Sequence, residues 1–207
     1  VSHRRLSNGE DKPYELNISW WSAMEDSSRD SKRFQFERFI LTQLLVMALK
    51  GVPAFYLPAL LASENDIKSF SMTGQRRDLN REKFKSENLL AVLNNPESNA
   101  NKNLKYLRNA MDVRSELKQF HPCSQMKCLS KGRSDIVVIK RGKGPKSVFA
   151  IHNMTENKIN YQLDDYDLPE LIDNDFNMKD FLASTKYNWK NISLDPFQVI
   201  WLGSLMK

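Results

Sequence analysis

The sequence lacks several features that would place it in a functional class at once. It has only two cysteines, Cys123 and Cys128, whereas a closed zinc site needs four ligands. No second Cys/His pair stands at ligand spacing, although His121 lies near, so we expect reduced cysteines and no bound metal. There is no charged-then-apolar leader, and no apolar run approaches the ~20 residues that a membrane span requires. We therefore expect a cytoplasmic protein with no cofactor and no membrane contact.

The charge pattern also lacks a nucleic-acid signature. Lys and Arg number 31 against 25 Asp and Glu, which gives a formal charge of +6 and a pI near 9.2. The basic residues are scattered, with acidic residues interleaved, and no arginine tract or zinc-finger spacing accompanies them. A basic balance without a basic stripe is typical of a lysine-rich surface, so we expect no nucleic-acid partner.

The apolar residues of the first half fall into two adjoining runs. Residues 33–49 carry apolar side chains on nearly all faces and are followed by Gly51, which predicts a buried helix with a glycine at its end. The short run 52–57 that follows is typical of a strand covered on both faces, as in a parallel sheet. Helix, turn and buried strand form an αβ unit, and ligands bind on the loops that follow such strands. The polar stretch 62–83 is therefore a candidate ligand-facing loop.

The second half changes character from helix to strand. Residues 103–120 have apolar positions near helical spacing, and Pro122 disfavours helix in the residue before it. Two apolar runs then flank the turn sequence "RGKGPK", which predicts a hairpin, and both 158–163 and 192–202 read as strands. The chain from about residue 123 is therefore expected to form a small antiparallel β domain.

The stretch "SFSMTGQRRDLNRE" places Arg76, Arg77 and Arg81 within six residues, directly after the most apolar part of the chain. One interpretation is a solvated charged loop. The other is a ligand-facing loop, because a planar guanidinium donates several hydrogen bonds in a fixed fork.

Four motifs, taken in order, resemble a known family: "KPYELNISWWSA" (12–23), "GVPAFYLPALLASEND" (51–66), "TGQRRDLNR" (73–81) and "DPFQVIWL" (195–202). Together they are similar to the carboxyl-terminal part of glycoside hydrolase family 13 enzymes of the sucrose phosphorylase type, and most similar to the glucosylglycerate phosphorylases. The resemblance implies an α/β plus all-β fold. Residues 1–122 would complete a (β/α)₈ TIM barrel with an active-site loop, and residues 123–207 would form an antiparallel β-sandwich domain.

The resemblance also implies retaining glucosyl transfer from a small-molecule glucoside to inorganic phosphate, which gives glucose 1-phosphate. Such enzymes use one carboxylate as nucleophile and another as general acid. In the family these carboxylates lie upstream of the matched motifs, so no catalytic residue is expected among the 207 residues. The chain would then need the N-terminal part of the barrel and would be inactive alone.

Three substrate-binding residues follow from the matched motifs. Arg77 stands where the family has an arginine that fixes hydroxyls of the glucosyl unit, with Arg76 one position away. Tyr14 and Glu15 match the loop that lines the leaving-group or phosphate site. Sucrose phosphorylases have Gln where Glu15 stands, and a carboxylate suits a polyol better than an anion. Each also has a plain alternative, a solvated loop for Arg77 and a surface turn for Tyr14 and Glu15.

A second functional class remains open at this point. Without recognisable catalytic carboxylates, the chain could be a non-catalytic module that binds carbohydrate or a partner chain. In either case, unpaired strand edges and exposed apolar faces would favour association of the isolated chain. The residues beyond 123 are expected to hold together best.

Overall fold

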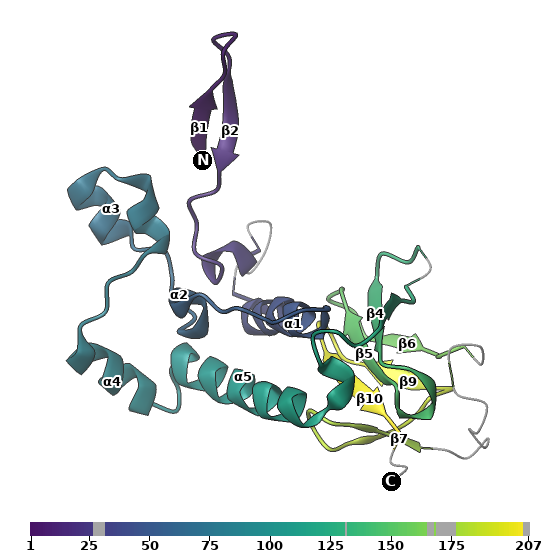
Figure 1. The fold of residues 1–207 in the computed structure, drawn as a ribbon. Coiled ribbons are helices and arrows are strands. Elements are labelled where there is room, and N and C mark those ends of the chain that lie inside the picture. The colour runs from purple at the N-terminus through teal and green to yellow at the C-terminus, as the bar shows by residue number, and fades with distance from the viewer. Residues whose placement is uncertain (27–31, 131, 165–167, 169–176, 205–207) are drawn as a thin grey trace. The chain divides into compact units, whose positions relative to one another are not determined.

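The computed structural model describes residues 1–26, 32–130, 132–164, 168 and 177–204. Its helices are α1 (Gln35–Ala48), α2 (Leu57–Leu60), α3 (Ile67–Thr73), α4 (Ser86–Asn94) and α5 (Asn99–Glu116), with short 3₁₀ turns η1 (Ser22–Met24), η2 (Arg76–Asn80), η3 (Lys118–Phe120) and η4 (Gly144–Lys146). Its strands are β1 (Ser2–Arg5), β2 (Asp11–Glu15), β3 (Met126–Cys128), β4 (Ile136–Arg141), β5 (Val148–Asn153), β6 (Ile159–Tyr161), β7 (Asn177–Asp180), β8 (Lys186–Asn188), β9 (Ile192–Leu194) and β10 (Val199–Gly203) (Figure 1).

The chain divides into two compact units. Unit 1 contains residues 1–35 and 55–106, and unit 2 contains residues 36–54 and 107–207. The division passes through α5, so the amino-terminal half of this helix belongs to unit 1 and the remainder to unit 2. Most of α1 and all the strands from β3 onward lie in unit 2.

Unit 2 is built on a six-stranded antiparallel sheet with the strand order β3-β4-β5-β10-β7-β8. Strands β4 and β5 form the hairpin that the sequence predicts, with Ile136 opposite Asn153 and Arg141 opposite Val148. A second, two-stranded sheet pairs β6 with β9. The predictions of an antiparallel hairpin here and of strands within 158–163 and 192–202 are confirmed.

The core of unit 2 lies among these strands, and every residue of β5 and β10 is buried. The central strands of a sheet lose water on both faces, which is why their sequences are apolar without alternation. The buried apolar cluster consists of Leu129, Ile136, Val138, Phe149, Ile151, Leu163, Leu168, Met178, Trp189, Ile192, Leu194, Ile200 and Leu202.

Helix α1 is buried on several faces, as its apolar sequence predicts. Its carboxyl end is held by two arginines of unit 2, and both are partly or wholly buried. A guanidinium at a helix carboxyl end satisfies carbonyls that have no partner within the helix and lies at the negative end of the helix dipole. Both guanidinium groups donate to main-chain carbonyls: Arg141 to Ala48 at 2.9 Å and Leu49 at 2.6 Å, and Arg114 to Met47 at 3.0 Å and Gly51 at 2.9 Å.

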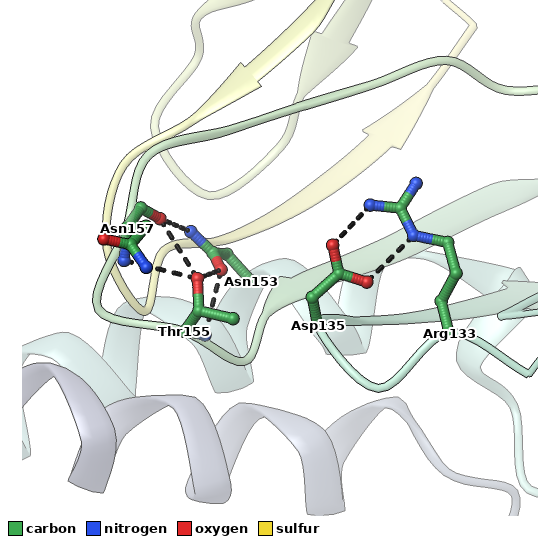
Figure 2. Close-up of polar contacts among 5 residues, drawn as sticks. All are labelled: Arg133, Asp135, Asn153, Thr155 and Asn157. Atoms are coloured by element: carbon green, nitrogen blue, oxygen red, sulfur yellow. Dashed lines mark hydrogen bonds and ion pairs between the residues drawn. The ribbon is translucent and has the colours of Figure 1, made fainter.

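The turn after β5 is organised by one fully buried amide, that of Asn153 (Figure 2). Its Oδ1 accepts hydrogen bonds from the backbone N–H and the hydroxyl of Thr155, at 3.0 and 2.8 Å. Its Nδ2 donates to the carbonyls of Asn157 and Asp195, at 2.7 and 2.8 Å. This side chain therefore ties the end of β5 both to its own turn and to the segment that leads into β10.

An ion pair stands just before β4, between Arg133 and Asp135 (Figure 2). The pair is bidentate, because Nε and Nη2 of Arg133 donate to the two carboxylate oxygens at 2.9 and 2.5 Å. The hydrogen bonds and charge of Arg133 lower the pKa of the Asp135 carboxyl. The same guanidinium lies 5.6 Å from the ring centroid of Tyr161, so it also covers the β6 side chain.

The buried strand expected at 52–57 is not formed in the described part of the chain. Residues 52–56 belong to no strand, and Leu57 begins helix α2. The side chains of Val52 and Tyr56 are 80% and 55% exposed, and Tyr56 keeps an extended backbone. A parallel strand must pair its N–H and C=O groups with neighbours on both sides. No described strand pairs with this segment, so the prediction of a covered strand is wrong for this chain.

Candidate functional site

The amino-terminal segment of unit 1 is a β-hairpin rather than a loop (Figure 1). Strands β1 and β2 pair in antiparallel register, with Arg4 opposite Lys12 and Ser2 opposite Glu15. Gly9 sits in the turn with φ +85°, and its N–H donates to the carbonyl of Leu6 at 3.0 Å. The Asn-Gly dipeptide in this turn is the sequence signal that predicts such a hairpin.

The arginine-rich loop is shaped by two local caps. Asp66 caps helix α3, because its carboxylate accepts from the backbone N–H and the hydroxyl of Ser69 at 2.9 and 2.5 Å. These hydrogen bonds lower the pKa of Asp66. Gly74 ends the helix with a φ of +68°, a conformation that glycine adopts without strain. The hydroxyl of Thr73 then donates to Asp78 at 2.6 Å and fixes the start of the turn η2.

A pair of hydrogen bonds to Asn65 ties this loop to the segment after β2. The backbone N–H of Ser19 donates to Asn65 Oδ1 at 2.7 Å, and the N–H of Asn65 donates to the hydroxyl of Ser22 at 3.1 Å. The next residue, Asp66, donates its N–H to the carbonyl of Leu79 at 2.8 Å and closes the loop on itself. Segments about 45 positions apart in sequence are thus held together by backbone-directed bonds.

Two of the three predicted substrate-binding residues meet in the structure. Nε of Arg77 lies 3.2 Å from Oε2 of Glu15, although 62 positions separate them in the sequence. The neighbouring Arg76 points elsewhere, and its Nη1 donates to the carbonyl of Val1. Tyr14 is 63% exposed and has no hydrogen bond to either residue of the pair in the described part of the chain. The structure therefore brings Arg77 to Glu15 and leaves Tyr14 at the surface.

The Arg77–Glu15 pair is open to a ligand. The two side chains are 53% and 30% exposed, and among the described residues the guanidinium bonds Glu15 through Nε alone. Such an exposed pair contributes at most about 1 kcal/mol to stability. Its remaining N–H groups and the free carboxylate lone pairs offer donors and acceptors side by side, which suits vicinal hydroxyl groups.

The adjacent tryptophans after β2 have different environments. Trp21 is 3% exposed and its carbonyl accepts from Gln35 Nε2 at 3.1 Å, whereas Trp20 is 41% exposed. One of the two is therefore a core residue. Trp20, by contrast, keeps part of its aromatic surface accessible.

Metal and membrane chemistry find no support in the described residues. Within them, no group of three or more His, Cys, Asp or Glu side chains could hold a metal ion, and both cysteines are free. None of the helices described is long and apolar enough to cross a membrane.

Comparison with known proteins finds glucosylglycerate phosphorylases and also the sucrose phosphorylase of Streptococcus mutans, which is 27% identical over 46% of this chain and 18% of the relative. The chain is 30% identical over 157 residues to the glucosylglycerate phosphorylase of Allomeiothermus silvanus, a match that covers 75% of this chain and 28% of the relative. It is 23% identical over 203 residues to the glucosylglycerate phosphorylase of Escherichia coli K12, which covers 98% of this chain and 34% of the relative. The chain thus spans about a third or less of the length of these curated relatives. No protein-family model matches it.

A solved structure shares the fold. The crystal structure of AmyP in complex with maltose aligns with a TM-score of 0.65 at 16% identity, over 87% of this chain and 37% of that one. At this identity the likeness concerns the fold alone.

Proposed function

Because this chain belongs to glycoside hydrolase family 13, in the group of the sucrose and glucosylglycerate phosphorylases, we propose that it is the carboxyl-terminal portion of a retaining glucoside phosphorylase. The substrate would be a glucosylglycerate-like or sucrose-like glucoside, and inorganic phosphate would accept the glucosyl unit. The catalytic carboxylates would lie outside these 207 residues, and this chain would supply part of the substrate-binding site.

The observation that carries the proposal is the 3.2 Å contact between Arg77 and Glu15. Both were singled out from motifs that are separate in the sequence, and each motif matches a different loop of the family. The carboxylate of Glu15 fixes the direction in which the guanidinium N–H groups point. The strength of their hydrogen bonds to substrate in the transition state depends on that direction. Arg77 would hold hydroxyls of the glucosyl unit, while Glu15 and Tyr14 would face the leaving group.

The chemistry of Glu15 indicates which part of the acceptor would lie beside it. A carboxylate accepts hydrogen bonds from hydroxyl groups and repels an anion placed directly beside it. It would therefore bind a hydroxyl-bearing part of the acceptor. An anionic acceptor such as glycerate would need its carboxylate placed away from Glu15.

The test is release of glucose 1-phosphate by the enzyme that contains this chain together with its catalytic carboxylates. Glucosylglycerate and sucrose are supplied separately with phosphate. We expect Arg77→Ala to lower kcat/KM by about a hundredfold or more, because a misplaced glucosyl unit loses its alignment. Full activity of Arg77→Ala would remove the sugar-holding role.

The matched control is Arg76→Ala, in the same turn and with the same loss of charge. Its guanidinium bonds the Val1 carbonyl rather than Glu15, so we expect a change of no more than a few fold. Equal losses in the two variants would assign the effect to the loop's charge and argue against a specific contact.

A further inference from the structure

Unit 2 contains a cavity at the point where α5 ends and the turn η3 follows. Its volume is about 500 Å³, within the range of small-molecule sites. Leu117, Phe120 and Pro122 supply apolar surface, while the charged or titratable lining comes from Arg114, Lys118 and His121. No Asp or Glu of the described residues lines it.

Among the described residues, no Asp or Glu lines this cavity to balance its positive charge. The Arg114 and Arg141 guanidinium groups lie 5.9 and 5.5 Å from the ring centroid of Phe120, and both donate to main-chain carbonyls. Burial lowers the pKa of both arginines, and the charge of Arg114 lowers that of Arg141 further. Two neighbouring cations that repel each other leave a field that favours an anion.

The polar groups that remain uncommitted on the cavity wall are donors. The hydroxyls of Ser115 and Ser124 already donate to the carbonyls of Asp112 and Lys118, at 2.7 and 3.0 Å. Nδ1 of His121 accepts the N–H of Cys123 at 3.2 Å, so in the neutral imidazole the proton sits on Nε2. The remaining donors are His121 Nε2–H, the Lys118 ammonium and Nη1 of Arg114, whose Nε and Nη2 bond main-chain carbonyls.

We propose that this cavity binds a phosphate group. A phosphate offers several strong acceptor oxygens, and a guanidinium, an ammonium and an imidazole N–H are the donors that proteins use for it. The volume leaves room for more than a free phosphate ion, so a phosphorylated monosaccharide fits as well. The free phosphate ion and the sugar phosphate would be bound through the same donors. They differ in whether the ligand also packs against the apolar wall of the cavity.

The inference goes beyond the proposed function. None of the cavity's lining residues is Arg77, Tyr14 or Glu15, and all of them belong to unit 2. Binding is measured on the 207-residue chain without any turnover. Phosphate binding by a chain whose parent enzyme is inactive would support this site and refute the phosphorylase. An active enzyme whose chain does not bind phosphate here would refute this site and support the phosphorylase.

The experiment is isothermal titration of the chain with inorganic phosphate, glucose 1-phosphate and glucose at low ionic strength. We expect both phosphate ligands to bind and glucose to show no heat. Tighter binding of glucose 1-phosphate supports a sugar phosphate, and equal binding supports a site for the phosphate group alone. Binding of glucose as tight as that of its phosphate, or no binding of either phosphate ligand, overturns the proposal.

The variants are Lys118→Gln and His121→Gln, since Arg114 also holds α1 and its loss would disturb folding. Each should weaken phosphate binding about tenfold, the usual effect of removing one charge-assisted hydrogen bond. As the control, Lys143→Gln removes the same charge from an exposed turn outside the cavity and should bind phosphate as the parent does. A loss of similar size in this control would mean that phosphate is held by net charge alone.

Discussion

Units 1 and 2 differ in how far each unit buries its own apolar side chains and pairs its own backbone N–H and C=O groups. In unit 2 the strands pair with one another, and their side chains form one continuous buried cluster. In unit 1, large apolar side chains remain exposed on several elements, among them Tyr14, Leu57, Ile67, Met72 and Leu90. The comparison shows that the strands of unit 2 bury their apolar side chains against one another, whereas several elements of unit 1 leave theirs exposed, a pattern typical of surfaces that contact other molecules.

The largest expected effect tests whether stability resides in unit 2. Trp201 is fully buried, and its ring centroid lies 4.6 Å from that of Phe120. We expect Trp201→Ala to lower the free energy of unfolding by about 3–5 kcal/mol, because it leaves a large cavity. Trp20→Ala, in unit 1 and 41% exposed, should cost less than about 1 kcal/mol. Urea unfolding measured by circular dichroism makes the comparison, and equal losses would contradict it.

Lowering the pH should reduce the free energy of unfolding of unit 2 through its buried histidine. His152 is fully buried, its Nδ1 lies 3.2 Å from the carbonyl of Val137, and burial lowers its pKa to about 4. Below about pH 6.5 the unfolded chain binds a proton that the folded chain resists, so stability is complete above that pH and falls toward pH 4. The loss should reach about 3 kcal/mol.

The variant His152→Gln isolates this effect, because its stability should lose most of the slope between pH 7 and pH 4. Asp180 acts in the opposite direction, since burial raises its pKa although three backbone N–H groups bond it. His3→Gln, in the exposed hairpin, should keep the slope of the parent. An unchanged slope in His152→Gln would refute the assignment.

An intermediate effect is expected at the turn drawn in Figure 2. Asn153→Ala removes the four hydrogen bonds that hold the end of β5 to its turn and to the segment before β10, which should cost about 2 kcal/mol. Asn157→Ala keeps the backbone carbonyl that Asn153 uses, so it should cost less than about 0.5 kcal/mol. Thermal unfolding of the two variants gives the difference, and similar melting temperatures would contradict it.

The smallest stability effect is expected in unit 1, at the pair proposed for substrate. Glu15→Gln breaks a half-exposed ion pair, so the free energy of unfolding should change by less than about 1 kcal/mol. In the active enzyme the same variant should shift the preference between glucosylglycerate and sucrose, measured as the ratio of their kcat/KM values. A stability loss as large as that of Trp201→Ala would make Glu15 a structural residue instead.

Local patterns in the sequence were sufficient for most of unit 2 and for the two long helices. The hairpin of β4 and β5 follows from two apolar runs around a glycine-rich turn, and α1 and α5 follow from apolar spacing. Helix α3 was missed because its short segment lies in the stretch 62–83 that was read as a polar loop, and α4 lies in a stretch for which no element was predicted. The burial of Arg141 was also not predicted, because a charged side chain is buried only where specific hydrogen-bond partners surround it in the fold.

For the candidate site, the residue types were foreseeable and their contact was not. The motifs singled out Arg77, Tyr14 and Glu15, and the bonds around Asn65 together with the pairing of β1 with β2 place the first of these beside the last. Arg76 and Arg77 likewise differ in their partners only in the folded chain, because adjacent residues in a tight turn point in different directions.

The sequence by itself determined the family, through motifs that resemble those of known enzymes. It also determined the β-rich character of the second half, because turn residues and apolar periodicity act over a few positions. Tertiary structure alone decided that Glu15 faces Arg77, that two guanidinium groups bond the carbonyls at the end of α1, and that residues 52–56 join none of the described strands. These outcomes depend on which groups are within reach in space, and a hydrogen bond or a strand pair requires a partner that local sequence cannot supply.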